Sequence, residues 1–247
     1  MNKNTADSIL EKVASDYNNI AGHFSQTRYR DWAEFSDFEK FLKTGVSVLD
    51  VGCGNGRLLH FLNRYRVKYV GIDVSSKLLK IAKQLVDEKI CTSITSHSFI
   101  EASAEKLPFA DRTFDIAFAI ASLYHIPSKE LRQRSINEIS RVLKPGGVFI
   151  MTYWNMWERS RRTLIYNNIT DKLVGKSNLD FFDANKPWKN PKGQVLAERF
   201  CHAFTLREIE RLSKKSSFRT VDKYYMKKGQ KSNSKYGFNG VYIGKKY

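Results

Sequence analysis

The chain has 247 residues, of which 42% are hydrophobic, and its 42 Lys and Arg residues against 25 Asp and Glu residues give a formal net charge of +17. This length and apolar content exclude global disorder and suit one domain with additions, while the polar first ten residues and the lack of any apolar stretch near the ~18 residues that span a bilayer argue against export and membrane insertion. The charge indicates either a nucleic-acid partner or a generally basic soluble surface.

The N-terminal part of the chain begins with two segments of helical spacing. Residues 6–17 place apolar side chains on one side of a predicted helix, and residues 33–42 form a second short helix with a phenylalanine face. Between them we predict a loop over residues 18–31. Its aromatic residues alternate with arginines, which is typical of a surface that stacks on a base and neutralises an anion, and equally of a segment that covers the core.

Strands and helices alternate from residue 46 to residue 153. The predicted strands cover residues 46–51, 69–73, 97–102, 114–120 and 148–153. The predicted helices cover residues 58–65, 78–86 and 131–143. Strands that alternate with helices form a parallel sheet with helices on both faces, and ligands bind at the carboxyl ends of its strands. The sequence therefore predicts a doubly wound α/β fold.

The first predicted strand runs into an acidic residue and three alternating glycines, namely Asp50, Gly52, Gly54 and Gly56. Glycine permits a left-handed turn and a close approach of the backbone to a nucleotide-like ligand. A nicotinamide site would instead carry the spacing G-x-G-x-x-G. An acid beside the turn suits a positively charged ligand, and Asp73, which ends the second strand, can accept from two ribose hydroxyls.

The region from residue 154 to residue 204 interrupts the alternation and mixes basic residues with tryptophans. Such a mixture suits single-stranded RNA, and it also suits a helical lid that buries its tryptophans over the cleft. Residues 205–212 form the last predicted helix, with Thr205 as its N-cap. Residues 219–226 and 240–246 form a terminal antiparallel pair on either side of a polar basic loop.

Several motifs in the expected order resemble the class I S-adenosylmethionine-dependent methyltransferases. They are VLDVGCGNG at residues 48–56, GID at 71–73, AEKLPF at 104–109, FD at 114–115 and LKPGG at 143–147. The resemblance implies a doubly wound, mostly parallel α/β sheet of seven strands in the order 3-2-1-4-5-7-6, with S-adenosyl-L-methionine as cofactor. The cofactor-binding residues that it implies are Asp50, Gly52, Cys53, Gly54, Asn55, Gly56, Asp73, Val74, Ser103, Ala104, Glu105 and Ala121.

The resemblance also implies a role for each of these groups. Asp50 and the backbone of residues 52–56 would hold the amino-acid part of the cofactor, Asp73 the ribose hydroxyls, and residues 103–105 would flank the adenine. Ser103 stands where the family usually has an aspartate. Its hydroxyl can accept a hydrogen bond from the adenine amino group, but a neutral acceptor gives a weaker bond than a carboxylate.

Methyl transfer requires a positioned nucleophile and the exclusion of water, because the sulfonium already makes the methyl group electrophilic. An amine or hydroxyl acceptor must lose a proton to a base, whereas a carboxylate is already nucleophilic at neutral pH. Residues 121–125 follow the fourth strand and are expected to face the methyl group. Among them, His125 is a base, a donor to the substrate, or a structural histidine beside Pro127 that satisfies backbone groups.

Shorter motifs are similar to those of the eukaryotic tRNA wobble-uridine carboxymethyl methyltransferases. Residues 17–29 carry YNxIAxHFSxTRY, residues 187–188 are Pro-Trp, and residues 199–204 are RFxHxF. Residues 123–125 depart from that family because LYH replaces a paired-histidine segment. The similarity implies methyl esterification of a carboxymethyl group on the wobble uridine of a tRNA, with a small zinc-binding activator protein as a partner.

The candidate catalytic residues are Arg28, Tyr29, Tyr124 and His125. The candidate substrate-binding residues are Arg28, Tyr29, Trp154, Arg199 and His202. Two other functions stay open at this point. The same fold serves small-molecule O- or C-methyltransferases, for which the positive charge would be incidental. A non-catalytic RNA-binding protein with a relic cofactor pocket is the other, although the intact acids and glycines count against it.

We expect one methyltransferase domain over residues 1–247. Its parts are a helical N-terminal cover (1–43), the cofactor-binding core (44–153), a lid for the substrate (154–204), and the last helix with antiparallel strands (205–247). The three cysteines are odd in number and widely spaced, so they indicate neither a disulfide framework nor a zinc site. Together with the absence of a leader this predicts a cytoplasmic protein without a metal.

Overall fold

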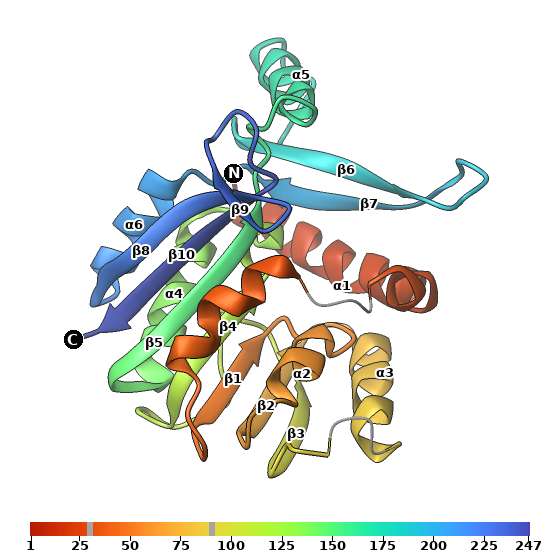
Figure 1. Ribbon diagram of the computed structural model, residues 1–247. Coiled ribbons are helices and arrows are strands. Elements are labelled where there is room, and N and C mark those ends of the chain that lie inside the picture. Colours follow the sequence, from red (N-terminus) through yellow and green to blue (C-terminus); the bar gives the residue numbers. More distant parts are fainter. Residues whose placement is uncertain (29–31, 89–91) are drawn as a thin grey trace.

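A mixed sheet forms the centre of the molecule in the computed structural model, which describes residues 1–28, 32–88 and 92–247. Within those residues the sheet has eight strands in the order β3-β2-β1-β4-β5-β10-β8-β9 (Figure 1). The parallel strands are β1 (Ser47–Val51), β2 (Lys68–Asp73), β3 (Ser96–Glu101), β4 (Phe114–Ile120) and β5 (Leu143–Trp154). The antiparallel strands are β8 (Phe218–Lys227), β9 (Gln230–Ser232) and β10 (Asn239–Lys246).

The predicted fold class is confirmed, with one strand more than expected. The first seven positions of the sheet follow the expected order 3-2-1-4-5-7-6 when β10 and β8 are counted as the seventh and sixth strands. The eighth, β9, pairs with the end of β8 and comes from the segment that we predicted to be a polar basic loop. Its three residues are polar and carry no alternating apolar pattern, so local sequence gave no signal for it.

Helices cover both faces of the sheet. One face packs on η1 (Ala33–Phe41), α2 (Arg57–Leu62) and α3 (Ser76–Asp87), and the other on α4 (Lys129–Val142) and α6 (Leu206–Lys215). Successive residues of β4 alternate between the two cores, with Ile116 and Phe118 on the first face and Ala117 and Ala119 on the second. Burial on both faces explains the nearly continuous apolar runs of the central strands.

The first helix is much longer than predicted. Helix α1 covers Lys3–Thr27, so the expected loop over residues 18–31 is wrong for residues 18–27, and residues 29–31 lie outside the described residues. Asn2 caps its start by accepting a hydrogen bond from the Thr5 backbone N–H at 2.8 Å. Ile20 packs with Trp188 in a small apolar cluster, and this tertiary contact keeps a polar sequence helical.

The insertion between β5 and α6 contains a hairpin that the sequence did not predict. It begins with helix α5 (Arg162–Leu173), followed by the antiparallel strands β6 (Asp183–Lys189) and β7 (Val195–His202). The hairpin extends beyond the main sheet and lies against α1 (Figure 1). A wholly helical lid is therefore wrong, whereas the predicted last helix is confirmed, because Thr205 Oγ1 accepts from the Glu208 backbone N–H at 3.1 Å.

None of the helices in the described ranges is both long and apolar enough to cross a lipid bilayer. Cys53 and Cys201 are buried free thiols, and Cys91 lies outside the described residues. The short 3₁₀ helix η2 (Leu123–His125) follows β4 at the carboxyl end of the sheet. The candidate site lies at this end.

Candidate functional site

The glycine turn after β1 adopts the conformation that its residues predict. Gly52 and Gly54 have φ angles of 74° and 56°, in the left-handed region that favours glycine. A Cβ atom on Gly52 would lie 2.4 Å from the Ser122 Cβ atom. Ser122 is fixed there because its hydroxyl donates to the Val51 carbonyl at 2.6 Å. Gly52 is therefore required both for the turn and for the packing of η2 against it.

The turn directs its backbone N–H groups into the protein. The N–H groups of Gly52 and Cys53 donate to the Ile72 carbonyl at 2.8 and 2.9 Å, and that of Gly54 donates to Asp73 Oδ2 at 2.8 Å. A phosphate-binding loop would leave these donors available to the anion. The turn therefore lacks the free backbone N–H donors of an anion-binding site. This agrees with the expectation of a positively charged ligand.

Asp50 supplies the negative charge at this position. Its side chain is 1% exposed, and Oδ2 accepts a hydrogen bond from the Tyr69 hydroxyl at 2.9 Å. Oδ1 has no hydrogen-bond partner in the described residues. Burial raises the pKa of Asp50 to about 7, although the hydrogen bond from Tyr69 opposes the rise. A buried carboxylate oxygen without a partner fits an ammonium group.

Asp73 ends β2 and is held by two backbone donors. Its Oδ1 accepts from the Ser75 N–H at 2.8 Å and its Oδ2 from the Gly54 N–H at the same distance. Burial raises the pKa of Asp73 to about 6, and these two hydrogen bonds limit the rise. Each carboxylate oxygen has a second lone pair, so Asp73 can still accept from a vicinal diol.

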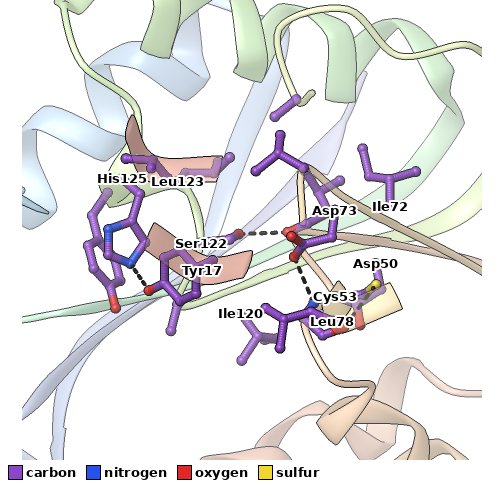
Figure 2. Close-up of a pocket in the computed structure, with 18 of the residues that line it drawn as sticks. Tyr17, Asp50, Cys53, Ile72, Asp73, Leu78, Ile120, Ser122, Leu123 and His125 are labelled. Carbon is purple, nitrogen blue, oxygen red and sulfur yellow. Dashed lines mark hydrogen bonds between the residues drawn. The ribbon is translucent and has the colours of Figure 1, made fainter. Parts of the chain in front are cut away.

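The remaining predicted cofactor residues, except Gly56, line one cavity of about 220 Å³ at the carboxyl ends of the parallel strands. Figure 2 shows part of this cavity, with Asp50, Cys53 and Asp73 labelled. Those that line it together with the two acids are Gly52, Cys53, Gly54, Asn55, Val74, Ser103, Ala104, Glu105 and Ala121. Gly56 does not line it; it precedes α2 and packs against Leu59 and Ala82. Ala121 has a φ of 52°, an uncommon angle for a residue with a side chain and one that concentrates at functional sites.

Helix α1 borders this cavity, which its sequence did not predict. Leu10, Val13, Tyr17 and Phe24 of α1 form one wall of it. Their helical spacing was visible, but the same spacing is typical of ordinary core packing. Asn18 ties α1 to the start of α3, because its Oδ1 accepts from the Ser75 hydroxyl at 2.8 Å and from the Lys77 N–H at 3.1 Å.

Both ring nitrogens of His125 are occupied. Nδ1 lies 2.5 Å from the Phe200 carbonyl oxygen, which can only accept, so Nδ1 carries the proton. Nε2 then accepts from the Tyr17 hydroxyl at 2.7 Å (Figure 2). Burial lowers the pKa of His125 to about 3. His125 therefore joins α1, η2 and β7 as a neutral structural group, which is one of the three roles that the sequence left open.

The tyrosines near the cavity stay protonated. Burial raises the pKa of Tyr17 to about 12, against the opposing effect of the nearby Arg199 guanidinium. Burial also raises the pKa of Tyr124, which stacks on Trp154 with ring centroids 5.3 Å apart. Neither phenol can accept a proton from a substrate near neutral pH.

Arg199 brings a positive charge to the same cavity from β7. The side chain is 3% exposed, and its guanidinium carbon lies 4.8 Å from the Trp154 ring centroid and 4.6 Å from that of Trp188. Its Nε has no hydrogen-bond partner in the described residues. No carboxylate of that part of the chain lies within ion-pair distance of it. Arg199 thus fits an anionic ligand group.

The end of α1 is joined to the glycine turn. The Arg28 carbonyl oxygen accepts from Asn55 Nδ2 at 3.0 Å and from Arg57 Nε at 3.1 Å, and the Arg28 guanidinium lies 5.1 Å from the Trp188 ring centroid. Arg28 therefore lies beside the cavity, as predicted from sequence. Tyr29, which we expected beside it, lies outside the described residues.

His202 is the predicted substrate residue that the structure keeps away from the site. It lies among the buried residues, with Nδ1 2.6 Å from Asp183 Oδ1 and Nε2 3.1 Å from both oxygens of Glu208. It is absent from the lining of the cavity. We therefore do not retain His202 as a substrate ligand, because its Nδ1 joins β7 to β6 and its Nε2 joins the hairpin to α6.

The described ranges contain no group of three or more His, Cys, Asp or Glu side chains placed to hold a metal ion. The charged groups that line the cavity are instead acids, among them Asp50 and Asp73, and arginines, among them Arg199. Such an arrangement suits a ligand with a positive group beside Asp50 and a second, anionic group beside Arg199. Tyr17, Tyr124 and His125 cannot act as general bases, which leaves only the acids of the cavity for that role.

Comparison with known proteins finds relatives for the part of the chain that carries the predicted cofactor residues. A family described as a methyltransferase domain matches residues 49–151. A tRNA (carboxymethyluridine(34)-5-O)-methyltransferase of Arabidopsis thaliana is 35% identical over 152 residues, which cover 62% of this chain and 35% of that protein. The enzyme of the same name from Saccharomyces cerevisiae is 30% identical over 189 residues, which cover 76% of this chain and 60% of that protein.

Solved structures share the fold at lower identity. A SAM-dependent methyltransferase from Methanosarcina mazei has a TM-score of 0.69 at 23% identity, covering 85% of this chain and 96% of that one. A methyltransferase in a complex with the Haloferax volcanii Trm112 methyltransferase activator has a TM-score of 0.62 at 15% identity, covering 94% of this chain and 96% of that one.

Proposed function

Because this chain belongs to the class I S-adenosylmethionine-dependent methyltransferases, we propose that it methylates a carboxylate carried by a wobble uridine of tRNA. The acceptor would be a carboxymethyl group, and the product its methyl ester. Two relatives with this activity in their names align with more than half of this chain, which itself spans only part of their length.

The cofactor fits the cavity on the evidence of its own residues. Asp50 Oδ1, buried and without a partner in the described residues, would accept from the ammonium group, and Asp73 would accept from the ribose hydroxyls. The segment from Ser103 to Glu105 would flank the adenine. When bound, S-adenosyl-L-methionine supplies a methyl group made electrophilic by its positively charged sulfur.

The protein side of the reaction requires no proton transfer. Tyr17 and His125 bond to each other, and burial keeps His125 neutral with its Nδ1 proton on the Phe200 carbonyl. Asp50, Asp73 and Glu105 are assigned to the cofactor in this proposal, so no described group of the cavity is left to act as a base toward the acceptor. A carboxylate acceptor is ionised at neutral pH, so one of its oxygens can form the new C–O bond without prior loss of a proton.

The single observation that carries the proposal is the position of Arg199. A 3% exposed guanidinium held between Trp154 and Trp188, without a described carboxylate partner, would be costly to bury unless a ligand neutralises it. A substrate carboxylate is the anion that the absence of a base also favours. The planar guanidinium would bind one carboxylate through parallel hydrogen bonds and orient it toward the cofactor cavity.

A small partner protein completes the proposal. By family resemblance this would be a zinc-binding activator. The methyltransferase that shares this fold in the Haloferax volcanii complex is bound to the Trm112 methyltransferase activator. Strand β3 is the surface that could take it. β3 forms one edge of the main sheet, the side chains of Ser96, His97 and Ser98 are exposed, and an edge strand leaves backbone groups available for another chain.

Nucleoside mass spectrometry tests the proposed reaction. The purified protein is incubated with isotopically labelled cofactor and total tRNA from cells that lack it, and the digested tRNA is analysed. We expect a labelled methyl ester on wobble uridine, and an Arg199→Gln protein should give little of it while retaining cofactor affinity. Label confined to small metabolites would refute the tRNA assignment, and failure to bind S-adenosylhomocysteine in calorimetry would support a relic pocket.

A further inference from the structure

A second, basic cavity adjoins the cofactor cavity and shares Arg28, Trp154 and Arg199 with it. It lies between the end of α1, the end of β5 and the β6–β7 hairpin. Three further cations line it, namely Arg161, Lys186 and Lys189. Arg28, Trp154 and Arg199 are substrate candidates from the sequence, which gives no individual role to Arg161, Lys186 or Lys189.

The described residues provide no carboxylate partner for four cations of this cavity. No described Asp or Glu side chain lies within ion-pair distance of Arg28, Arg161, Lys186 or Arg199. Burial lowers the pKa of Lys186, and the positive charges of Arg161 and Arg199 lower it further. Burial followed by the charge of Arg199 does the same to the pKa of Arg28. Positive charges that lie close together repel one another and destabilise the folded protein. An anionic ligand would offset this repulsion.

The cluster is held in place by aromatic rings. The Trp154 ring centroid lies 5.7 Å from the Arg161 guanidinium and 5.9 Å from Lys186 Nζ. Trp188 is fixed in turn, because its indole N–H donates to His23 Nδ1 at 2.8 Å. Arg161 also donates to the Phe238 carbonyl at 2.7 Å. The charges are therefore positioned before any ligand arrives, which reduces the entropy lost on binding.

One carboxylate cannot balance this many cations. If Arg199 binds the acceptor carboxylate, Arg161 and Lys186, which contact the same Trp154 ring, still require an anion. RNA carries one negative charge for each nucleotide, next to bases that stack on aromatic rings. A phosphodiester flanking the acceptor nucleotide therefore supplies the missing charge.

We propose that Arg161 and Lys186 bind the phosphodiester that flanks the acceptor nucleotide in single-stranded RNA. This inference rests on the proposed function, because it takes the acceptor carboxylate as the ligand of Arg199. It adds that the protein recognises a strand and not an isolated nucleoside. A free nucleotide carries the same phosphate chemistry, and the experiment separates it from RNA.

Two substrates with one acceptor base test the inference. Methyl ester formation is measured on 5-carboxymethyluridine as a nucleoside and on a trinucleotide that carries it in the middle. Lys186→Gln should lower kcat/KM for the trinucleotide roughly tenfold, as expected for the loss of one charge-assisted hydrogen bond, and change that for the nucleoside less than about twofold. Lys186→Arg should restore the trinucleotide rate. Equal effects of Lys186→Gln on both substrates would overturn the inference.

Lys43→Gln is the matched control. Lys43 is exposed and lies just before β1, at the amino end of the sheet and away from both cavities. The substitution removes the same charge, so it should leave kcat/KM for both substrates unchanged. A trinucleotide loss equal to that of Lys186→Gln would mean that net charge, and not this cavity, attracts the RNA.

If neither substrate is methylated, that result contradicts the proposed function alone. A binding measurement then still tests the inference. Fluorescence anisotropy with a labelled unmodified uridine trinucleotide should show about tenfold weaker binding by the Lys186→Gln protein and a smaller dependence of affinity on salt. Unchanged binding would overturn the subsite. Uridine monophosphate that competes as well as the trinucleotide would assign the cavity to a free nucleotide and overturn the RNA assignment.

Discussion

Replacing Asp50 by asparagine should stabilise the unliganded protein while removing its affinity for the cofactor. Asp50 is 1% exposed, and burial raises its pKa from 3.8 to about 7. The unfolded chain therefore loses the proton of Asp50 near pH 4 and the folded chain only near pH 7. Between these values unfolding releases a proton, so the free energy of unfolding falls as the pH rises.

The size of the effect follows from the same pKa. At pH 8 the buried charge lowers the free energy of unfolding by about 4 kcal/mol, at about 1.4 kcal/mol for each pH unit between the two pKa values. Asparagine keeps an oxygen that can accept from Tyr69 but buries an amide N–H₂ group, at a cost of about 1–3 kcal/mol. Asp50→Asn should therefore raise the free energy of unfolding at pH 8 by about 1–3 kcal/mol, with no gain at pH 4.

Cofactor affinity should change in the opposite direction. An ammonium group requires the ionised carboxylate, so wild-type affinity for S-adenosylhomocysteine should fall about tenfold for each pH unit below 7. Breaking a buried charge pair costs 2–5 kcal/mol or more, which predicts at least about 30-fold weaker binding by the Asp50→Asn protein at pH 8. Asp73, whose pKa is about 6, adds a further loss below that pH.

Urea denaturation of the unliganded protein and calorimetry with S-adenosylhomocysteine, both between pH 5 and pH 8, measure these effects. Tyr69→Phe is the matched variant, because it removes the described hydrogen bond to Asp50 and leaves the carboxylate in place. It should raise the pKa of Asp50 and move the onset of tight binding to higher pH. Binding by the Asp50→Asn protein within threefold of wild type at pH 8 would refute the assignment of Asp50 to the ammonium group.

Gly52→Ala should lower the free energy of unfolding by several kcal/mol in urea denaturation, because the new Cβ would lie 2.4 Å from the Ser122 Cβ atom. Gly45 has a φ of 86° and open space around it, so Gly45→Ala should cost only about 1–2 kcal/mol. Equal losses would contradict the packing argument. At saturating cofactor, kcat should stay constant from pH 6.5 to pH 9, since His125 is no base and the acceptor is already ionised; a tenfold rise per pH unit would point to a proton-bearing acceptor. Arg199→Lys keeps the charge but loses the planar fork, so kcat/KM for the RNA substrate should fall about tenfold or more in a methyl-ester assay, and an unchanged value would contradict carboxylate recognition by Arg199.

The cofactor side of this protein could be predicted from its sequence. The glycine turn, Asp50 before it and Asp73 at the end of the next strand are close in the chain, and parallel strands bring their carboxyl ends to one edge of a sheet. Short-range spacing and strand topology were therefore sufficient for this part. The expectation of a positively charged ligand also came from the acid beside the turn.

The limits of helix α1 and the role of His125 could not be predicted in the same way. The segment after residue 17 is rich in polar residues, and it is helical because Ile20 packs against Trp188 of a distant hairpin. His125 is neutral and structural because Tyr17 and Phe200 occupy its nitrogens, from 108 and 75 residues away. Contacts between residues so far apart in the chain leave no periodicity in the sequence near either partner.

What the sequence determined by itself was the fold class and the cluster of cavity residues proposed to hold the cofactor, because residues that are neighbours in the chain or on adjacent strands define both. The sequence indicated Arg28, Trp154 and Arg199 as substrate candidates, but only the tertiary structure shows how they meet and adds Arg161 and Lys186 to them. These residues come together when the β6–β7 hairpin packs against α1 and the end of β5. In the sequence Arg161 and Lys186 indicate little more than a solvated surface. Their meaning comes from the grouping of a buried and several half-buried positive charges without a described acid to balance them.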